Sequence, residues 1–305
     1  MALTAGLSRI DASAPQGEID AESFQYWRRN DGAPWATFYR RSGGYLLRFH
    51  DLADFLVSHD GGDIIAKPTP SASLETVRHL YGHHVAPLAA SLRKTLTLHA
   101  SAVVIEAGAV AFIAPSGSGK STLAASIAQR GFPLLADDGI ALHWQDGRPM
   151  AQPDSCIVRL WNDSWNTLIG TRQCATHQVE YSEKLGASDV PGITLAHREA
   201  ELRAVLFLEP EDGDAQRSSG RGEVRFDVVP APNAVVRLTA NSFLLDRDAA
   251  GAAAWHFSEI ARLAAPNGPV TFLALRYPRD FERLIEVGDA VLAKFGATTA
   301  PSQRG

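Results

Sequence analysis

The sequence contains little that points to an extracellular, membrane or nucleic-acid-binding protein. Only two of its 305 residues are cysteines, Cys156 and Cys174, and their spacing is unlike a metal site, which suits a reducing cytosol. The formal net charge of -5 provides no general positive field for nucleic acid. No apolar stretch approaches the roughly 18 residues that a membrane helix needs, and residues 1–12 do not resemble a signal peptide. We therefore expect a cytoplasmic protein with no membrane or nucleic-acid partner.

The most informative stretch is residues 114–122, which read Ala-Pro-Ser-Gly-Ser-Gly-Lys-Ser-Thr. An apolar run at 109–113 predicts a strand before it, and the pattern of 121–130 predicts a helix after it. Glycines between a strand and a helix let backbone N–H groups curl around a phosphate, and the helix N-terminus adds partial positive charge. Ala114 replaces the first glycine of the strict phosphate-loop pattern. The alternative is a Gly/Ser-rich turn that only caps a helix. The predicted nucleotide-binding residues are Ser116, Gly117, Ser118, Gly119, Lys120, Ser121 and Thr122.

An acidic pair, Asp137 and Asp138, ends the next apolar run at 134–136. Ligands of open α/β sheets bind at the carboxyl ends of strands, so we expect the loop and the pair to converge there. Lys120 would then reach the β- and γ-phosphates, and the Ser121 hydroxyl would bind magnesium. Two carboxylates can divide the remaining work, one holding the metal and one accepting a hydroxyl proton. The alternative is that Asp-Asp-Gly is only a turn.

The residues around the loop resemble the catalytic core of the HPr serine kinase/phosphorylase family. The resemblance rests on Leu-His-Ala-Ser at 98–101, on the loop, and on residues 129–138, which bring the acidic pair as close to the lysine as in that family. It implies an α/β fold with a P-loop core of the HPr-kinase/PEP-carboxykinase-like type, and ATP and Mg²⁺ as cofactors. It also implies that Asp137 is the base toward the acceptor serine, that Asp138 is linked to magnesium, and that His99 lies beside the phosphates. Taken alone, His99 would be read as a core histidine.

Other segments resemble a divergent branch of that family, which includes kinases that phosphorylate the C-terminal serine of lasso-peptide precursors. These segments are 45–49, 53–55, 75–92, 158–161 and 276–281. Thr122 stands where HPr kinases usually carry glutamate, and their downstream glycine-rich segment and basic phosphorolysis loop are missing. The resemblance thus implies a peptide or small-protein partner with an acceptor serine rather than HPr, and it is compatible with a homo-oligomer.

Composition and periodicity divide the chain into successive parts. We expect a loosely ordered N-terminus at 1–22, a small α+β unit at 23–92, a kinase domain at 93–296 and a flexible tail at 297–305. The small unit is expected to be β-rich, with strands at 36–39, 45–49 and 63–66 and a helix at 74–91. In the kinase domain we expect strands at 158–161, 203–208 and 270–275, helices at 163–169, 251–263 and 278–295, and a charged surface loop at 209–223. The apolar face of the last helix would comprise Phe281, Leu284, Ile285, Val291 and Leu292.

Several further residues allow two interpretations. His79 and His83 stand four apart, which suits a metal, but we read them as an ordinary helix surface. Arg159 either offers a fixed charge to a phosphate or packs beside Trp161. Lys184 lies in a polar stretch, 181–189, that is either a lid over the site or a solvated loop.

The function predicted from the sequence is an ATP- and Mg²⁺-dependent serine kinase that acts on a peptide or small protein. The first alternative is a nucleotide-binding regulatory module that has lost phosphoryl transfer. Others are an HPr kinase/phosphorylase acting on a carrier protein, a relative of phosphoenolpyruvate carboxykinase, for which the chain is short, and a simple ATPase.

Overall fold

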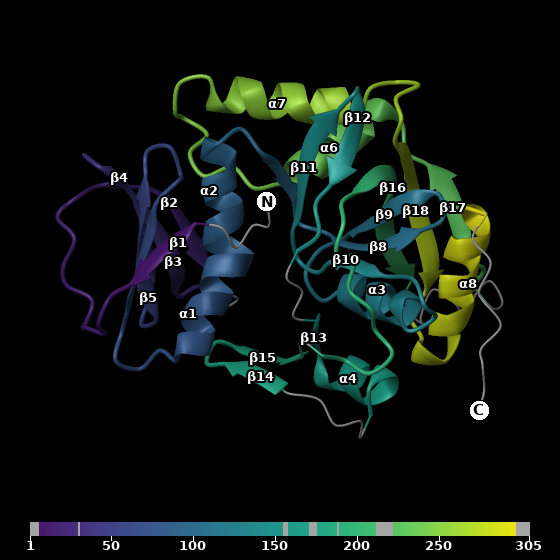
Figure 1. Cartoon of the computed structure of the whole chain (residues 1–305), viewed down its shortest axis with the longest axis horizontal. Helices are drawn as coiled ribbons and strands as arrows, with labels where there is room; N and C mark the ends of the chain where they lie inside the picture. The colour runs from purple at the N-terminus through teal and green to yellow at the C-terminus, as the bar shows by residue number, and fades with distance from the viewer. Residues whose placement is uncertain are drawn as a thin grey trace. The chain divides into compact units, whose positions relative to one another are not determined.

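The described part of the chain contains both strands and helices, which gives the protein a mixed α/β fold (Figure 1). The computed structural model describes residues 6–29, 31–154, 158–170, 176–187, 189–211 and 222–296. The chain forms two compact units, and each is assembled from separate stretches. The first contains Met1–Thr97, His177–Glu183 and Phe243–His256; the second contains Leu98–Thr176, Lys184–Ser242 and Phe257–Gly305.

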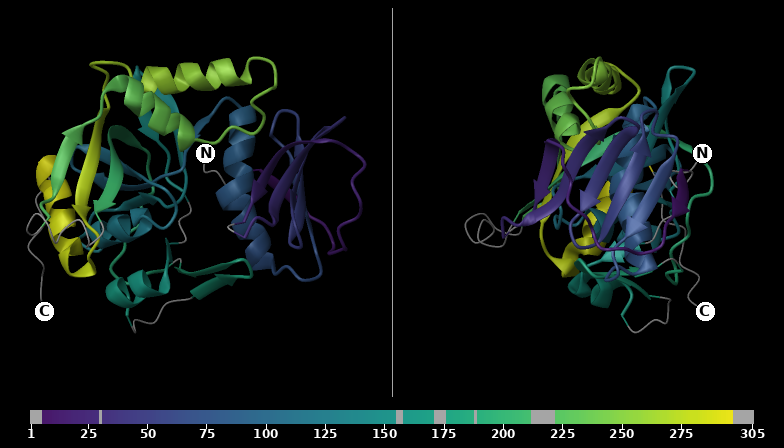
Figure 2. Two further views of the ribbon diagram at one scale, coloured as in Figure 1. Left: turned by 180° about the vertical axis from the view of Figure 1, so that it is seen from behind. Right: turned by 90° about the vertical axis from the view of Figure 1, so that its left-hand side faces the viewer.

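The first unit is built on a six-stranded sheet in the order β1-β6-β5-β4-β3-β2. Its strands are β1 (Leu7–Ile10), β2 (Ser23–Arg28), β3 (Pro34–Arg41), β4 (Gly44–Phe49), β5 (Ala53–Ser58) and β6 (Ile64–Pro68). All neighbours are antiparallel except β1 and β6, which are parallel. The right-hand view of Figure 2 shows these strands side by side. The predicted strands at 36–39, 45–49 and 63–66 are confirmed.

A continuous helical stretch belongs to the same core. It consists of α1 (Leu74–Leu80), a π-helical turn η1 (Tyr81–Val85) and α2 (Ala86–Leu92), which confirms the helix predicted at 74–91. Buried positions alternate along β5, so one face of the sheet supplies the core, as expected for a half-buried strand. Large buried side chains in this core include Phe38, Phe49, Phe55, Leu80 and Leu88.

The expectation of a loosely ordered segment over 1–22 is wrong for part of it. Residues 7–10 form β1 and pair with β6. Beyond the strand, the Asp11 and Ala14 amides donate to Ala66 and Pro68 at 2.8 and 3.0 Å. The open edge of β6 provides unpaired backbone groups that can bind a passing chain whatever its side chains, so composition did not indicate this pairing.

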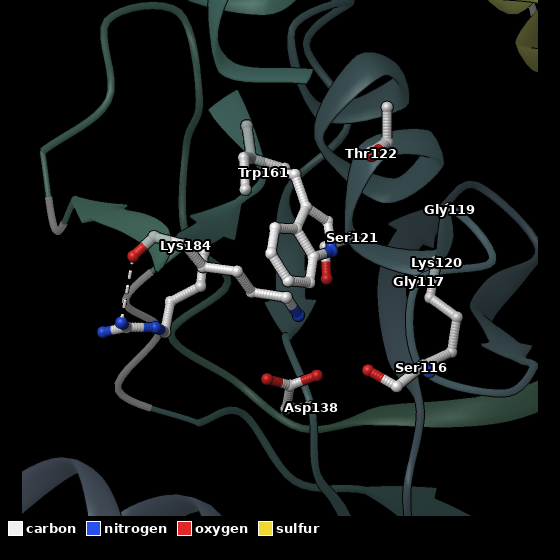
Figure 3. A pocket seen from close by; sticks show the side chains of 11 residues that line it. Ser116, Gly117, Gly119, Lys120, Ser121, Thr122, Asp138, Trp161 and Lys184 are labelled. Carbon is white, nitrogen blue, oxygen red and sulfur yellow. Dashed lines mark hydrogen bonds between the residues drawn. The ribbon is translucent and has the colours of Figure 1, made fainter. Parts of the chain in front are cut away.

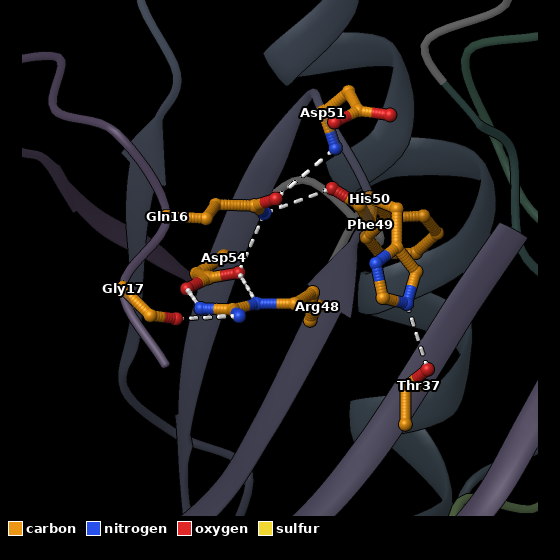
Figure 4. Close-up of polar contacts among 8 residues, drawn as sticks. All are labelled: Gln16, Gly17, Thr37, Arg48, Phe49, His50, Asp51 and Asp54. Carbon is orange, nitrogen blue, oxygen red and sulfur yellow. Dashed lines mark hydrogen bonds and ion pairs between the residues drawn. The ribbon is translucent and has the colours of Figure 1, made fainter. Parts of the chain in front are cut away.

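Hydrogen bonds that involve side chains also attach Gln16 and Gly17 to the sheet (Figure 4). The Gln16 amide donates to Phe49 O at 3.0 Å and to Asp54 Oδ1 at 2.8 Å. Arg48, which faces Asp54 across β4 and β5, donates to both of its carboxylate oxygens at 2.9 and 2.7 Å and to Gly17 O at 2.7 Å. Two charge-assisted hydrogen bonds of this kind hold the Arg48 and Asp54 side chains in one relative orientation.

His79 does not lie on an ordinary helix surface. It is buried, its ring stacks on His83 with centroids 4.1 Å apart, and Nδ1 lies within hydrogen-bonding distance of the Tyr181 hydroxyl. The π-helical turn changes the phase of the helix just after His79, so the spacing of an ideal helix does not predict which residues face inward. No cluster of His, Cys, Asp or Glu suited to a metal is found among the residues that the structure describes.

The second unit contains a larger sheet that includes the path β10-β8-β9-β16-β12-β11, with β18 beside β16 and β17 beside β18. Its strands are β8 (Ser101–Ile105), β9 (Gly108–Ile113), β10 (Leu134–Ala136), β11 (Ile140–Gln145), β12 (Arg148–Ala151), β16 (Ala200–Glu211), β17 (Arg225–Val228) and β18 (Thr271–Pro278). Strands β9, β16 and β18 run parallel to one another. Strand β7 (Leu96–Leu98) spans the division between the units.

The helices and a small separate sheet complete the described elements. The helices are α3 (Lys120–Ala128), α4 (Asn162–Leu168), α6 (Ala231–Ala240), α7 (Ala252–Leu263), the short 3₁₀ turn η2 (Phe281–Arg283) and α8 (Leu284–Lys294). Helix α3 packs against α8. The small sheet has the order β13-β15-β14, with β13 (Val158–Leu160), β14 (Thr176–Val179) and β15 (Ser182–Ala187).

Most elements predicted in this part of the chain are confirmed. They are the strands at 109–113, 134–136, 158–161, 203–208 and 270–275 and the helices at 121–130, 163–169 and 251–263. The stretch around Lys184 is not a loop, because 182–187 form β15. The expected loop at 209–223 begins later, since β16 continues to Glu211, and its central part, like Cys156 and Cys174, lies outside the described residues.

The final helix differs from its prediction at both its start and its face. It begins at Leu284, after a 3₁₀ turn that contains Phe281. Leu284, Val291 and Leu292 are buried as expected, whereas Phe281 and Ile285 are 40% and 65% exposed. Ile285 lies one position away from the 3.6-residue stripe that starts at Leu284 and therefore points outward. No helix in the described part of the chain is long and apolar enough to cross a membrane.

Candidate functional site

The loop 114–119 connects the end of β9 to the start of α3, as the sequence predicts. Gly117 and Gly119 have φ angles of +81° and +90°, a left-handed conformation that costs little only for glycine. Gly119 is also the residue that caps the N-terminus of α3. The turn therefore requires glycine at these two positions, and it directs the chain into a helix N-terminus that favours anions.

The end of β18 braces the outer side of this loop. The Tyr277 hydroxyl donates to Ser118 O at 3.2 Å, and Arg279 Nη2 donates to Gly117 O at 3.1 Å. Burial raises the pKa of Tyr277 to about 12, so the hydroxyl remains a donor at neutral pH. Both residues lie in the segment 276–281 that resembles the divergent family branch, but no sequence pattern links them to the loop.

A pocket opens beside the loop (Figure 3). Its lining residues are Ser116, Gly117, Gly119, Lys120, Ser121, Thr122, Asp138, Arg159, Leu160, Trp161 and Lys184. The structure thus brings together all the predicted nucleotide-binding residues except Ser118, and it adds Asp138 and residues of β13 and β15. Leu160 and Trp161 were not predicted as pocket residues; an apolar strand end followed by tryptophan is too common to indicate one.

Lys120 lines this pocket and is only 5% exposed. Its Nζ donates to Ala114 O at 2.7 Å, within its own loop. Burial lowers the pKa of Lys120, an effect that the nearby Asp138 carboxylate opposes. A partly desolvated ammonium interacts more strongly with an anion than one in water does.

The acidic pair follows β10, and its two members face different surroundings. Strand β10 is antiparallel to β8, which is antiparallel to β9, so β10 and β9 run in the same direction and end at the same edge. Asp138 lines the pocket and its carboxylate points into it (Figure 3). Its φ angle of +74° is unusual for a residue with a side chain, although Asp tolerates this region better than most. The expected convergence of the loop with the acidic pair is found for Asp138.

Asp137 is instead 2% exposed and does not line the pocket. Ser101 Oγ donates to its Oδ1 at 2.7 Å, and the Arg159 amide donates to its Oδ2 at 3.2 Å. Burial and the Asp138 carboxylate raise the pKa of Asp137, while hydrogen bonds from Ser101, Ser121 and the Arg159 amide oppose that rise. Asp137 is therefore linked to the pocket through the Ser121 hydroxyl rather than directly.

His99 lies outside the pocket lining and supports Asp138 from behind. Its Nδ1 is 3.0 Å from the backbone oxygen of Asp138. Because a carbonyl oxygen only accepts, Nδ1 carries the hydrogen. Burial, followed by the charge of Lys120, lowers the pKa of His99, which favours the neutral ring. The resemblance implies a place beside the phosphates, which stays a prediction; His99 does not line the pocket and instead contacts the backbone where Asp138 adopts its positive φ.

Thr122 and Arg159 both combine pocket lining with structural contacts. Thr122 Oγ1 donates to Ser164 Oγ at 3.0 Å and so ties α3 to α4. Arg159 is 1% exposed, and its Nη2 donates to Lys184 O at 3.1 Å. The contacts of Arg159 fit the packing interpretation, although its place in the lining keeps it near any bound anion.

Comparison with known proteins does not identify a family for this chain. No family model matches it, and no curated protein matches its sequence. Among solved structures it is similar to the Hpr(Ser) kinase/phosphatase from Coxiella burnetii, at 13% sequence identity and a TM-score of 0.32, over 66% of this chain and 97% of that one. The function is accordingly inferred from the residues of this chain.

Proposed function

We propose that this protein is a phosphotransferase that uses ATP and Mg²⁺ to phosphorylate a serine hydroxyl of a peptide or small protein. The observation that carries the proposal is the shared pocket of Lys120, Ser121 and Asp138 beside a glycine loop at a helix N-terminus. Phosphoryl transfer needs a phosphate cradle, a metal-binding oxygen and a group that accepts the hydroxyl proton. These residue types supply all three in one place.

On the loop side, the backbone amides and Lys120 would bind the phosphates. Rotation of the Lys120 side chain would exchange its bond to Ala114 O for one to a phosphate oxygen. Gly117 and Gly119 line the pocket, and their left-handed conformations let the backbone curl around a phosphate.

Magnesium fits the oxygen donors of this site. Mg²⁺ usually takes only one or two protein oxygens beside substrate phosphates and water, and here Ser121 offers a hydroxyl in the pocket. A hydrogen bond from the Ser121 hydroxyl to Asp137 would turn the oxygen lone pairs toward the metal. When bound, Mg²⁺ neutralises charge on the β- and γ-phosphates.

The geometry favours an exchange of the roles that the resemblance implies for the acidic pair. Asp138 faces the pocket, so we assign it as the base, and we assign buried Asp137 to the metal side through Ser121. The serine oxygen forms a bond to the γ-phosphorus and passes its proton to the Asp138 carboxylate. The bond between the γ-phosphorus and its bridging oxygen breaks, and the electron pair leaves with ADP.

The acceptor is proposed from the sequence resemblance. A lasso-peptide-like precursor that ends in serine is the substrate to examine first, and the same peptide ending in alanine is its control. Transfer of labelled phosphate to the serine peptide only is the expected result.

Variants at the pocket test the assignment. Lys120→Met and Asp138→Asn should abolish most transfer, whereas Asp248→Asn, at an exposed carboxylate of the other unit, should leave it unchanged. Full transfer by Asp138→Asn would disprove its role as the base. Nucleotide binding without phosphorylation of any peptide would instead identify a regulatory module.

A further inference from the structure

The wall of the pocket opposite the loop contains a second lysine. Lys184 projects from β15, and its ammonium group points into the pocket (Figure 3). Its Nζ lies 5.8 Å from the centroid of the Trp161 ring, a cation–π contact. Trp161 is 42% exposed although it is a large aromatic residue. The wall therefore presents a cation and an aromatic face to whatever binds there.

The backbone that carries Lys184 is held in place. Strand β15 pairs with β13 in the register Arg159↔Gly186 and Leu160↔Leu185. Within this pair, Arg159 Nη2 donates to Lys184 O at 3.1 Å. Since the Arg159 amide also binds Asp137, the strand pair connects Lys184 to the acidic residues at the end of β10. A side chain on a paired strand can be positioned more accurately than one on a loop.

The pocket has more positive than negative charge. Lys120, Arg159 and Lys184 line it, and Asp138 is the only carboxylate among the lining residues that the structure describes. Lys184 is close enough to Lys120 to contribute to the lowered pKa of that residue, after the larger effect of burial. Two cations that approach each other from opposite walls repel unless a multiply charged anion lies between them, as a triphosphate would.

We propose that Lys184 is a second catalytic cation that contacts the transferred phosphoryl group from the wall opposite Lys120, and that Trp161 is a positioning residue for its ammonium group. This inference rests on the proposed function. Lys120 belongs to the loop and would remain with the β- and γ-phosphates throughout. Lys184 would stabilise the charge on the phosphoryl oxygens as the phosphorus leaves the bridging oxygen for the serine oxygen, as a cation supplied in addition to the loop does in other phosphoryl transferases.

The test compares Lys184→Met and Lys184→Arg with a matched control, Lys294→Met. Lys294 also makes a cation–π contact, over Phe226 at 5.6 Å, but does not line the pocket. We expect Lys184→Met to lower kcat by about 10²–10³-fold, with KM for ATP changed far less. Lys184→Arg should retain part of the activity, and Lys294→Met should behave as the wild type.

Binding measurements separate stabilisation of the transition state from ordinary binding. Lys184→Met should bind ADP with aluminium fluoride, a mimic of the transferring phosphoryl group, much more weakly than the wild type, while its affinity for a non-hydrolysable ATP analogue changes little. Trp161→Leu should lower kcat, whereas Trp161→Phe should retain most of the wild-type kcat. Equal losses for both nucleotides, a loss confined to KM for the peptide, or unchanged kcat would each overturn the role of Lys184.

Failure of the proposed function gives a different result. If the wild-type protein binds nucleotide but phosphorylates no hydroxyl, the serine-kinase proposal fails. Even then, the affinity for ADP with aluminium fluoride can be compared with the affinity for the ATP analogue, because neither measurement needs an acceptor. That comparison still decides whether Lys184 favours the mimic of the transferring phosphoryl group.

Discussion

Asp137 and Asp138 are neighbours in the chain, yet one is buried and the other lines the pocket. The left-handed backbone at Asp138 turns its side chain to a different side from that of Asp137. Burial makes Asp137 a group whose charge costs energy, whereas Asp138 can reach a ligand directly. This difference in environment suits the two carboxylates to different roles.

The raised pKa of Asp137 predicts a pH-dependent stability. Above the ordinary Asp value of about 3.9 the unfolded chain has lost this proton while the folded protein keeps it, so the free energy of unfolding falls as the pH rises toward the folded pKa. Asp137→Asn removes this pH dependence, because asparagine does not titrate. Its altered hydrogen bonds lower the free energy of unfolding by a similar amount at every pH. Urea denaturation of both proteins across this pH range measures the difference. Parallel curves for wild type and variant would contradict the prediction, and Asp289→Asn, at a more exposed ion pair with Arg130, is the control.

His99 should act on the reaction only by holding Asp138. His99→Ala removes the hydrogen bond to the Asp138 carbonyl, which should cost about 0.5–1.5 kcal/mol of stability and lower kcat more than it raises KM for ATP. His99→Asn retains an N–H donor and should recover part of the kcat. Because burial lowers the pKa of His99, the rates of wild type and His99→Asn should change in parallel above about pH 6.5. A rate difference that titrates in that range would indicate that the His99 ring exchanges protons.

Among the elements, β18 and the residue just after it hold the loop that follows β9 through two hydrogen bonds. Tyr277→Phe and Arg279→Ala each remove a hydrogen bond to a loop carbonyl. We expect each to weaken ATP affinity by about 0.5–1.5 kcal/mol, roughly 2- to 13-fold, with a smaller effect on kcat. Titration calorimetry with a non-hydrolysable analogue measures the change. Tyr26→Phe, at an exposed tyrosine of the other unit, should have no effect, and unchanged affinity in both loop variants would rule out the bracing role.

At the scale of the whole molecule, the first unit depends on a segment far along the chain. Leu245 is fully buried in its core, and its amide donates to Ser91 Oγ at 3.1 Å. The carboxylate of the adjacent Asp246 accepts hydrogen bonds from Nε and Nη2 of Arg40, both at 2.7 Å. The unit is therefore complete only when residues 243–256 have returned to it.

Leu245→Ala should destabilise this unit strongly. Removing a fully buried leucine side chain costs about 2–5 kcal/mol, depending on how far the core can collapse. Chemical denaturation followed by circular dichroism measures the loss. Val228→Ala, at a residue that is 79% exposed, should change the stability by less than about 0.5 kcal/mol. Similar losses in the two variants would show that Leu245 contributes little.

Local sequence patterns predicted much of the secondary structure and the place of the loop. A strand, a glycine turn and a helix were recognisable because hydrophobic periodicity and turn-forming residues are signals that a few neighbouring positions carry. The position of Asp138 was also predictable, since it needed only the rule that strands of like direction end at one edge. The N-terminal strand was not, because it depends on the edge of β6, whose paired residues lie 56 to 57 positions further along the chain.

Local patterns were enough to predict the strand, loop and helix around Lys120, the glycine turn at 117 and 119, and the place of the acidic pair after β10, because backbone conformation and short-range periodicity dictate them. Tertiary contacts were needed to show which carboxylate enters the pocket, where His99 points, and that Lys184 and Trp161 form the opposite wall. Burial and electrostatic environment depend on segments that are distant in the chain and meet only when the sheets are assembled.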